Sequence, residues 1–139
     1  MKLQTKIVSF LAVLVVFSFT QQCHTTMENE LLKHVSNGDY KEAKALLQQD
    51  VDKNKKSLET GNTPLHIAVI KGFENIVELL LIFWADPHKK NYYNEKPIDI
   101  AKQIYTAAVK EKDTETTIIY SRIIKILSLY TIPEGASRR

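Results

Sequence analysis

The chain carries four histidines and one cysteine, side chains that often bind metals or attack substrates. The histidines are His24, His34, His66 and His88, and the closest two are ten positions apart. Zinc sites commonly contain ligand pairs separated by roughly two to five residues, so this spacing predicts no metal site. His66 follows a Thr-Pro step in the stretch 61–72, and its role there needs an explanation.

Catalytic groups are equally poorly supported by the sequence. Cys23 lies beside a predicted processing junction, and no serine stands in the Gly-x-Ser-x-Gly turn of a hydrolase. The chain has only four glycines, and none of them forms a phosphate-binding loop. We therefore expect no enzymatic activity, no cofactor and no small-molecule substrate.

The N-terminal residues predict an export signal. Lys2 and Lys6 precede an apolar run at residues 7–19. As a helix this run would be about 20 Å long, against roughly 30 Å of bilayer hydrocarbon, so it suits a secretory signal better than a membrane span. We assign residues 1–22 to a signal peptide and expect a secreted or periplasmic protein.

The processing site allows an alternative. A small-x-small pattern places the cut before Gln21, whereas a lipoprotein signal would be cut before Cys23. Two glutamines precede Cys23, where lipoprotein signals have small residues. The alternative is a membrane-tethered protein, held by lipid on Cys23 or by an uncleaved segment 7–19. Only in that case do we expect a membrane as a partner.

Charge and cysteine content narrow the class of protein further. The full chain has a formal net charge of +3, and removal of the signal leaves 17 basic and 16 acidic residues. This near-neutral balance gives no reason to expect binding to nucleic acid. A single cysteine excludes an internal disulfide, so packing must stabilise the domain.

A period of 33 to 34 residues organises the rest of the chain. The segment 64–68, Pro-Leu-His-Ile-Ala, is echoed by 97–101, Pro-Ile-Asp-Ile-Ala, and the segment 38–47 aligns with 72–81. Such a repeat predicts units that each expose an apolar face and bury it by stacking.

Each unit predicts two short helices. In the central unit Thr63 suits an N-cap and Pro64 the first turn, so we expect a helix from Pro64 to about Lys71. Gly72 should end it in the left-handed conformation. A second helix, from about Glu74 to Phe83, has apolar residues at helical spacing, namely Ile76, Val77, Leu80 and Leu81.

These residues resemble the ankyrin repeat. The match runs through Gly61-x-Thr63-Pro64-Leu65-His66-x-Ala68, Gly72, Ile76-Val77-x-Leu79-Leu80 and Ala85-Asp86-Pro87. The resemblance implies an all-α solenoid of about three helix-turn-helix units over residues 27–130, with units at about 27–54, 55–87 and 88–130. It also implies that Thr63 and His66 hydrogen-bond each other and nearby backbone, which makes Thr63, Pro64, His66 and Gly72 structural residues.

The third unit departs from the repeat pattern. Asn94 replaces the loop glycine, Lys96 the threonine and Asp99 the histidine. Its helices are expected to be elongated, at about 97–111 and 115–130, and to form a C-terminal cap. We predict a disordered tail at 131–139.

The resemblance implies that the protein binds another protein through its loop tips and the exposed, concave side of each first helix. Tyr92 and Tyr93 are the leading candidates, because paired tyrosines offer large, stiff contact area. The alternative is that one of them packs on Asn94 or on the neighbouring loop. The other candidates carried over by position are Glu59, Thr60, Asn62, Ile70, Lys71, Glu95, Gln103 and Ile104.

Two further groups of residues allow a functional interpretation. Phe83 and Trp84 stand where the family has a small residue and a glycine. They either pack against the C-terminal helices or form a secondary exposed patch. The loop lysines at positions 53, 55, 56, 89 and 90 could favour an acidic partner, or could simply be solvated. Short ankyrin chains with a signal resemble bacterial exported proteins, so we also expect a bacterial source.

Overall fold

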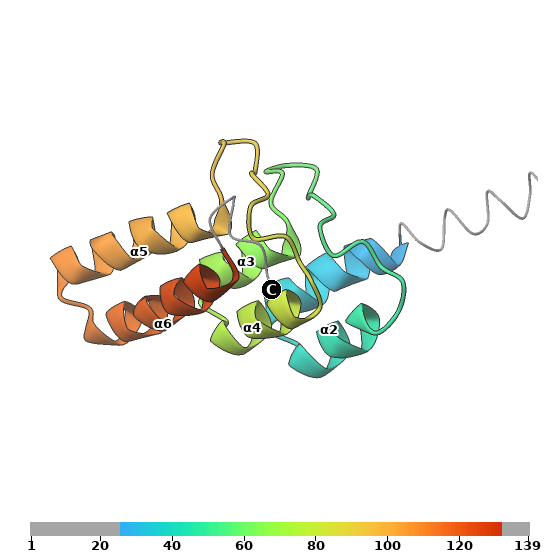
Figure 1. Ribbon diagram of the computed structural model, residues 1–139, viewed down its shortest axis with the longest axis horizontal. Coiled ribbons are helices and arrows are strands. Elements are labelled where there is room, and N and C mark those ends of the chain that lie inside the picture. The colour runs from blue at the N-terminus through green and yellow to red at the C-terminus, as the bar shows by residue number, and fades with distance from the viewer. Residues whose placement is uncertain (1–25, 132–139) are drawn as a thin grey trace, which may run out of the picture.

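The computed structural model describes residues 26–131, which form a short helical stack (Figure 1). The predicted signal at 1–22 lies outside the described residues, as does the predicted tail beyond Thr131. Helix is the only regular secondary structure within residues 26–131, as the all-α prediction requires. A helix covers residues 26–37, and the others are α2 (Tyr40–Leu47), α3 (Pro64–Lys71), α4 (Glu74–Ile82), α5 (Pro97–Glu111) and α6 (Thr114–Tyr130).

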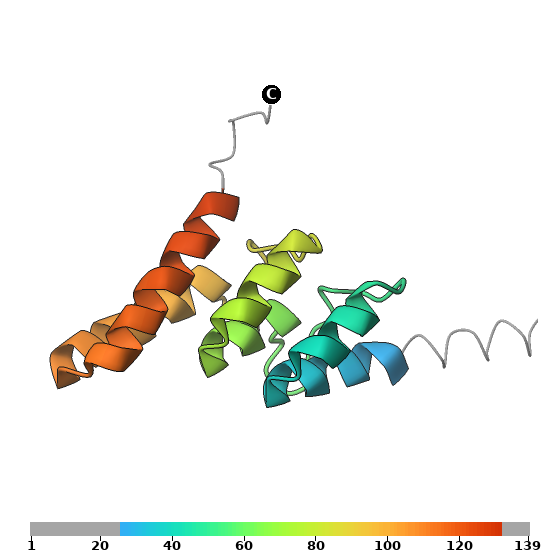
Figure 2. The same cartoon turned by 90° about the horizontal axis from the view of Figure 1, so that it is seen from below.

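The helices form two layers (Figures 1 and 2). One layer contains the helix at 26–37, α3 and α5, and the other contains α2, α4 and α6 in the same order. Two long loops, at residues 51–62 and 86–96, project side by side from the edge of the first layer. Each unit therefore contributes one helix to each layer, as the repeat period predicts.

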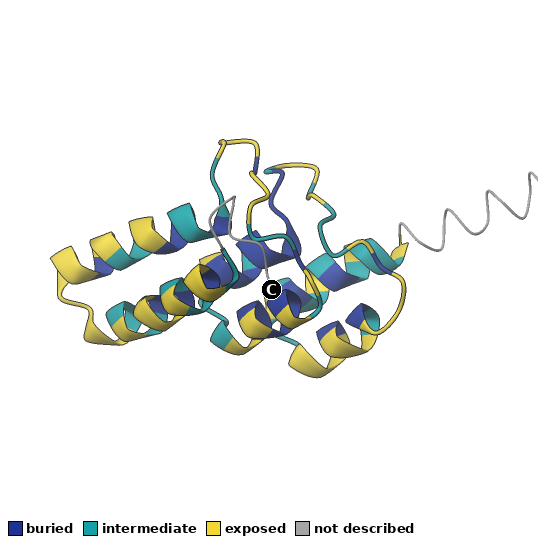
Figure 3. Cartoon of the chain, viewed as in Figure 1, coloured by how far each residue is buried: buried dark blue, intermediate teal, exposed yellow. Residues whose placement is uncertain are grey.

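A single apolar core runs through all three units (Figure 3). Removing one leucine or isoleucine side chain from water contributes roughly 1.5–3 kcal/mol, so the core depends on every unit being present. The largest fully buried apolar side chains come from four of the helices and include Leu31, Leu65, Ile76, Leu80, Ile123 and Leu127.

Local sequence determines where the central helices begin and end. Thr63 is the extended N-cap of α3, Pro64 occupies the first turn, and Gly72 ends the helix with φ 71°. These features match the prediction, because proline and glycine favour opposite helix ends. The sequence predicted that α4 ends at about Phe83, whereas it ends one residue earlier, at Ile82.

The long C-terminal helices were also predicted from sequence, and they pack against each other as a cap. Lys112, in the left-handed conformation with φ 58°, ends α5, and the Asp113 side chain accepts a hydrogen bond from the Thr116 N–H at the start of α6. From α6, the buried Tyr120 hydroxyl reaches the carbonyl oxygens of Val69 (2.9 Å) and Ile70 (3.0 Å) at the end of α3.

The first unit is stabilised by local polar contacts. His34 Nδ1 lies 2.9 Å from Asp39 Oδ2, and His34 Nε2 lies 3.5 Å from Glu30 Oε2. Gly38 turns the chain with φ 83°, and a Cβ there would lie 3.0 Å from the Phe73 ring of the next unit. His34 thus holds together the turn between the first helix and α2.

Candidate recognition surface

His66 lies in the interior and joins two repeat units. Its Nδ1 atom is 2.8 Å from Thr63 Oγ1 and 3.2 Å from the Thr63 backbone nitrogen, while Nε2 is 3.0 Å from the Glu95 carbonyl oxygen. Because a backbone N–H can only donate, Nδ1 must accept, and Nε2 must carry the hydrogen donated to Glu95. The Thr63–His66 pairing that the resemblance implied is therefore present in the structure.

The electrostatics of His66 fit this arrangement. Burial lowers the pKa of His66, and the Glu95 carbonyl only partly opposes the shift. Nearby Lys56 lowers the pKa further. The neutral ring is the form that can accept from Thr63 and donate to Glu95, so burial and hydrogen bonding favour the same state.

The two long loops are joined by a second set of hydrogen bonds. Asn91 Nδ2 donates to Asn62 Oδ1 (3.1 Å) and Glu95 Oε2 (3.2 Å), and the Tyr92 N–H donates to the Thr60 carbonyl (3.0 Å). Asn62 is only 9% exposed. Its predicted place on the exposed strip is therefore wrong, because its side chain is used between the loops.

Tyr92 and Tyr93 are exposed at the tip of the second loop, at 61% and 69%. The Tyr92 ring also lies against Gly61 of the first loop, where a Cβ would come within 2.5 Å of it. Lys56 Nζ is 5.8 Å from the ring centroid of Tyr92. Tyr92 therefore packs on the neighbouring loop, which was the alternative to a role in binding, yet most of its side-chain surface stays exposed.

The other candidates divide into exposed and partly covered residues. Glu59, Ile70, Lys71 and Gln103 are exposed, as the predicted strip requires. Gln103 Nε2 donates to Glu95 Oε1 at 2.9 Å, so the two candidates from α5 and the second loop are in contact. Three candidates, Thr60, Glu95 and Ile104, are half-buried. The structure therefore brings the loop candidates together more closely than the helical ones.

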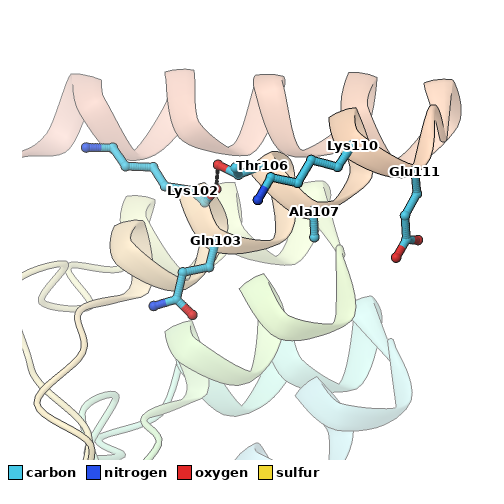
Figure 4. A pocket seen from close by; sticks show the side chains of 6 residues that line it. All are labelled: Lys102, Gln103, Thr106, Ala107, Lys110 and Glu111. Carbon is cyan, nitrogen blue, oxygen red and sulfur yellow. Dashed lines mark hydrogen bonds between the residues drawn. The ribbon is translucent and has the colours of Figure 1, made fainter.

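A shallow hollow of about 510 Å³ lies along the outer face of α5 (Figure 4). Its lining contains two lysines and one acid, and Thr106 Oγ1 donates to the Lys102 carbonyl at 2.8 Å. No histidine lines it, and all of its residues come from one helix. The lining residues are Lys102, Gln103, Thr106, Ala107, Lys110 and Glu111.

A second hollow, of about 370 Å³, lies between the first helix and the first loop. Leu32 comes from the helix and Leu58 from the loop, where its side chain is 91% exposed. Sequence reasoning missed both residues, although a lone leucine in a polar loop was a visible signal. The other lining residues are Asn29, Lys55, Lys56, Ser57 and Glu59.

Phe83 and Trp84 have different surroundings. Phe83 is half-buried and packs against the core, whereas Trp84 is 74% exposed at the end of α4. The interpretation that both pack against the C-terminal helices is therefore wrong for Trp84. Trp84 has φ 67°, a conformation that costs an L-residue roughly 1–2 kcal/mol, which explains why the family has glycine here.

Residues 26–131 show neither a metal-binding cluster nor a membrane-spanning helix. No group of three or more His, Cys, Asp or Glu side chains there could hold a metal ion. None of the helices described is long and apolar enough to cross a membrane.

The comparisons with known proteins agree with the geometry. A family model described as ankyrin repeats (3 copies) matches residues 4–91 and 31–113. A 2-5A-dependent ribonuclease of Mus musculus is 39% identical over 74 residues, which cover 53% of this chain and 10% of that protein. This chain thus spans about a tenth of that relative's length. Ankyrin repeats are generally protein–protein interaction modules and are typically non-catalytic. The chain belongs to the ankyrin-repeat family.

Proposed function

We propose that this protein is a non-catalytic recognition module that binds a partner protein on its two loop tips and the adjoining first-helix layer. The observation that carries the proposal is the exposure of Tyr92 and Tyr93 on a loop whose backbone is already fixed. Large aromatic side chains on a rigid base give contact area with little loss of conformational entropy.

The fixed base is supported by three interactions between the loops. His66 donates to the Glu95 carbonyl, Asn91 donates to Asn62, and the Tyr92 N–H donates to Thr60. Two of these involve buried side chains, where hydrogen bonds compete little with water. The loop tips therefore present their side chains without needing to fold on binding.

The binding proposal can be tested by capture of the natural partner. The purified protein would be immobilised and exposed to an extract of its native source, and bound proteins would be quantified by mass spectrometry. Tyr92→Ala with Tyr93→Ala should weaken capture at least about tenfold, as expected for hot-spot residues. Tyr93→Ala alone should reduce capture with nearly unchanged Tm, since Tyr93 does not support Gly61.

Trp84→Ala is the matched control for this experiment. Trp84 is a similarly exposed aromatic residue, but it lies at the end of α4 rather than on a loop tip. We expect the control to retain capture. Full capture by the tyrosine variants, or loss only in the Trp84 variant, would move the binding site away from the loops.

We also propose that the protein is exported, with residues 1–22 removed, from a bacterial source. The basic start and the apolar run at 7–19 support this proposal. The family model's first match begins at residue 4 and therefore overlaps the predicted signal. For this reason the N-terminus of the mature protein should be measured directly. A soluble mature chain beginning near Gln21 is expected. Detergent partitioning with lipid on Cys23 would support tethering, and a soluble chain retaining Met1 would contradict export.

We propose no ribonuclease activity for this protein. The similarity to the mouse enzyme covers only a tenth of that protein's length. The two hollows described above contain no histidine, the side chain that most often transfers protons in catalysis. Incubation of the purified protein with end-labelled RNA should leave the RNA intact, and cleavage lost on mutation of one residue would contradict the proposal.

A further inference from the structure

The two loop tips, defined as residues 55–60 and 88–94, have a charge unlike that of the domain as a whole. They contain four lysines, Lys55, Lys56, Lys89 and Lys90, but only one acidic residue, Glu59. The whole chain, by contrast, has 19 basic and 16 acidic residues. Positive charge is therefore concentrated at the surface that the proposed function uses.

The lysines at the tips are not equivalent. Lys55 Nζ forms an ion pair with Glu28 Oε2 at 3.0 Å. Lys56 makes no ion pair with a carboxylate of the described residues, and its ammonium group lies 5.8 Å from the Tyr92 ring centroid. Lys90 Nζ donates to Asn94 Oδ1 at 3.0 Å, which leaves its charge unneutralised. Lys56 and Lys90 therefore offer charge to a ligand.

The hollow between the first helix and the first loop lies beside this charge. Lys56 and Leu58 both line it, with Leu32 opposite on the helix. Because Lys56 also lies near the Tyr92 ring, it connects the hollow to the tip of the second loop. Its volume of about 370 Å³ is large enough for an aliphatic side chain.

We propose that this surface binds an extended protein segment in which an aliphatic residue is flanked by acidic residues. The aliphatic side chain lies in the hollow between Leu32 and Leu58, and the flanking carboxylates lie near Lys56 and the lysines of the second tip. The proposal rests on the proposed function and adds the chemistry of the partner. It requires both charge complementarity and a hollow that offers two leucines, so neither feature alone is sufficient.

An anionic membrane surface would be attracted by the same charges. Leu58 and the two tyrosines are exposed beside lysines, a combination also used at lipid interfaces. The hollow favours a protein segment, because a flat surface cannot fill a cavity bounded by a helix and a loop. Binding to anionic vesicles without binding to such a segment would therefore contradict the proposal.

The probe is a fluorescein-labelled peptide with the sequence Gly-Asp-Glu-Leu-Asp-Gly, measured by fluorescence anisotropy with the purified protein. One control peptide replaces each acid by its amide, and the other replaces leucine by serine. The acidic leucine peptide should bind at least about tenfold tighter than either control. Its affinity should fall when salt rises from about 50 to about 500 mM, because salt screens exposed charges.

Variants of the protein locate the binding. Lys56→Glu should lower the affinity for the acidic leucine peptide at least about tenfold, and Leu58→Ser should lower it several-fold. Lys125→Glu makes the same charge change on an exposed residue of α6, away from the loops, and should have no effect. Unchanged Tm in each variant would show that folding is intact.

Three results would overturn this partner chemistry. They are equal binding of all three peptides, equal effects of Lys56→Glu and Lys125→Glu, and binding to phosphatidylserine vesicles without binding to the peptide. If any of these occurs while capture of the natural partner still depends on Tyr93, the proposed function stands and only the partner chemistry fails. If capture is also independent of both tyrosines, both proposals fail.

Discussion

The second and third repeat units begin their first helices with the same backbone geometry but different side chains. Thr63 and Lys96 are both extended N-cap residues followed by proline. His66 accepts a hydrogen bond from the Thr63 N–H at 3.2 Å, and Asp99 accepts one from the Lys96 N–H at 3.0 Å. A carboxylate can thus replace the imidazole for the task of capping a helix.

His66 and Asp99 differ in what their second polar side-chain atom contacts. His66 Nε2 donates to Glu95 in the following unit, whereas no bond from Asp99 to another unit occurs in residues 26–131. The imidazole of His66 has two nitrogens, so one bonds Thr63 in its own unit and the other bonds Glu95 in the following unit. Asp99 needs only to cap α5, whose long partner α6 completes the stack.

The third unit also donates a hydrogen bond to the preceding second unit. The Tyr120 hydroxyl is shared between the carbonyls of Val69 and Ile70, two of the last four carbonyls of α3, whose regular helical partners are missing. The Val69 carbonyl also accepts from the Gly72 N–H. Burial raises the pKa of Tyr120, which keeps the hydroxyl protonated and able to donate. The junction between these units is therefore stabilised from both sides.

The largest effect should follow from His66→Ala. The substitution leaves a cavity and removes the partners of the Thr63 hydroxyl and the Glu95 carbonyl, so we expect a loss of about 3 kcal/mol in the free energy of unfolding. Urea denaturation followed by circular dichroism would measure it. A loss below about 1 kcal/mol would show that the bond between units is not needed.

A smaller effect is expected from Tyr120→Phe. The ring is kept, so only the hydroxyl's bonds to α3 are lost, and the free energy of unfolding should fall by about 1–2 kcal/mol. Tyr105→Phe provides a control, since Tyr105 is a partly buried tyrosine on the neighbouring helix α5. Equal stability of the Tyr120 variant and the wild type would contradict the proposed backward contact.

Asp99→Ala should cost less than either of these. It removes a single, partly exposed hydrogen bond at a helix start, which is worth about 1 kcal/mol. The same denaturation experiment applies. If Asp99→Ala cost as much as His66→Ala, the two helix starts would be equivalent and the distinction drawn between the units would be wrong.

The smallest effect, near neutral pH, should come from protonation of His66. Its folded-state pKa is lowered by burial, so the unfolded chain takes up a proton first as the pH falls. Stability from His66 is thus fully present above the ordinary histidine pKa of 6.5 and declines as the pH drops below it. Comparison of wild type with His66→Gln between about pH 7.5 and 5 measures this contribution. Identical pH profiles would contradict it.

Sequence predicted the helices well because their ends depend on local chemistry. The bounds of α3 and α5 match those predicted, and α4 and α6 each differ by one residue. At α3, Thr63, Pro64 and Gly72 determine the ends through backbone geometry and hydrogen bonds to near neighbours. The left-handed conformation of Asn94, with φ 64°, follows from the same local reasoning.

The candidate site was less predictable because it depends on how the two loops lie against each other. The burial of Asn62 comes from its bond to Asn91, 29 positions away in the sequence. The hollow between Leu32 and Leu58 similarly joins residues from a helix and a loop. The exposure of Trp84 depends on the arrangement of helix ends. A repeat pattern shows that units stack, but these contacts arise only from the stacked arrangement.

Hydrogen exchange of the protein with and without its captured partner tests the binding surface most directly. Binding through the loops predicts slower exchange in residues 55–62 and 88–95, with unchanged exchange in α2 and in the solvent-facing turns of α4 and α6. Protection confined to α2, α4 and α6, with unchanged exchange in both loops, would contradict recognition by the loop tips.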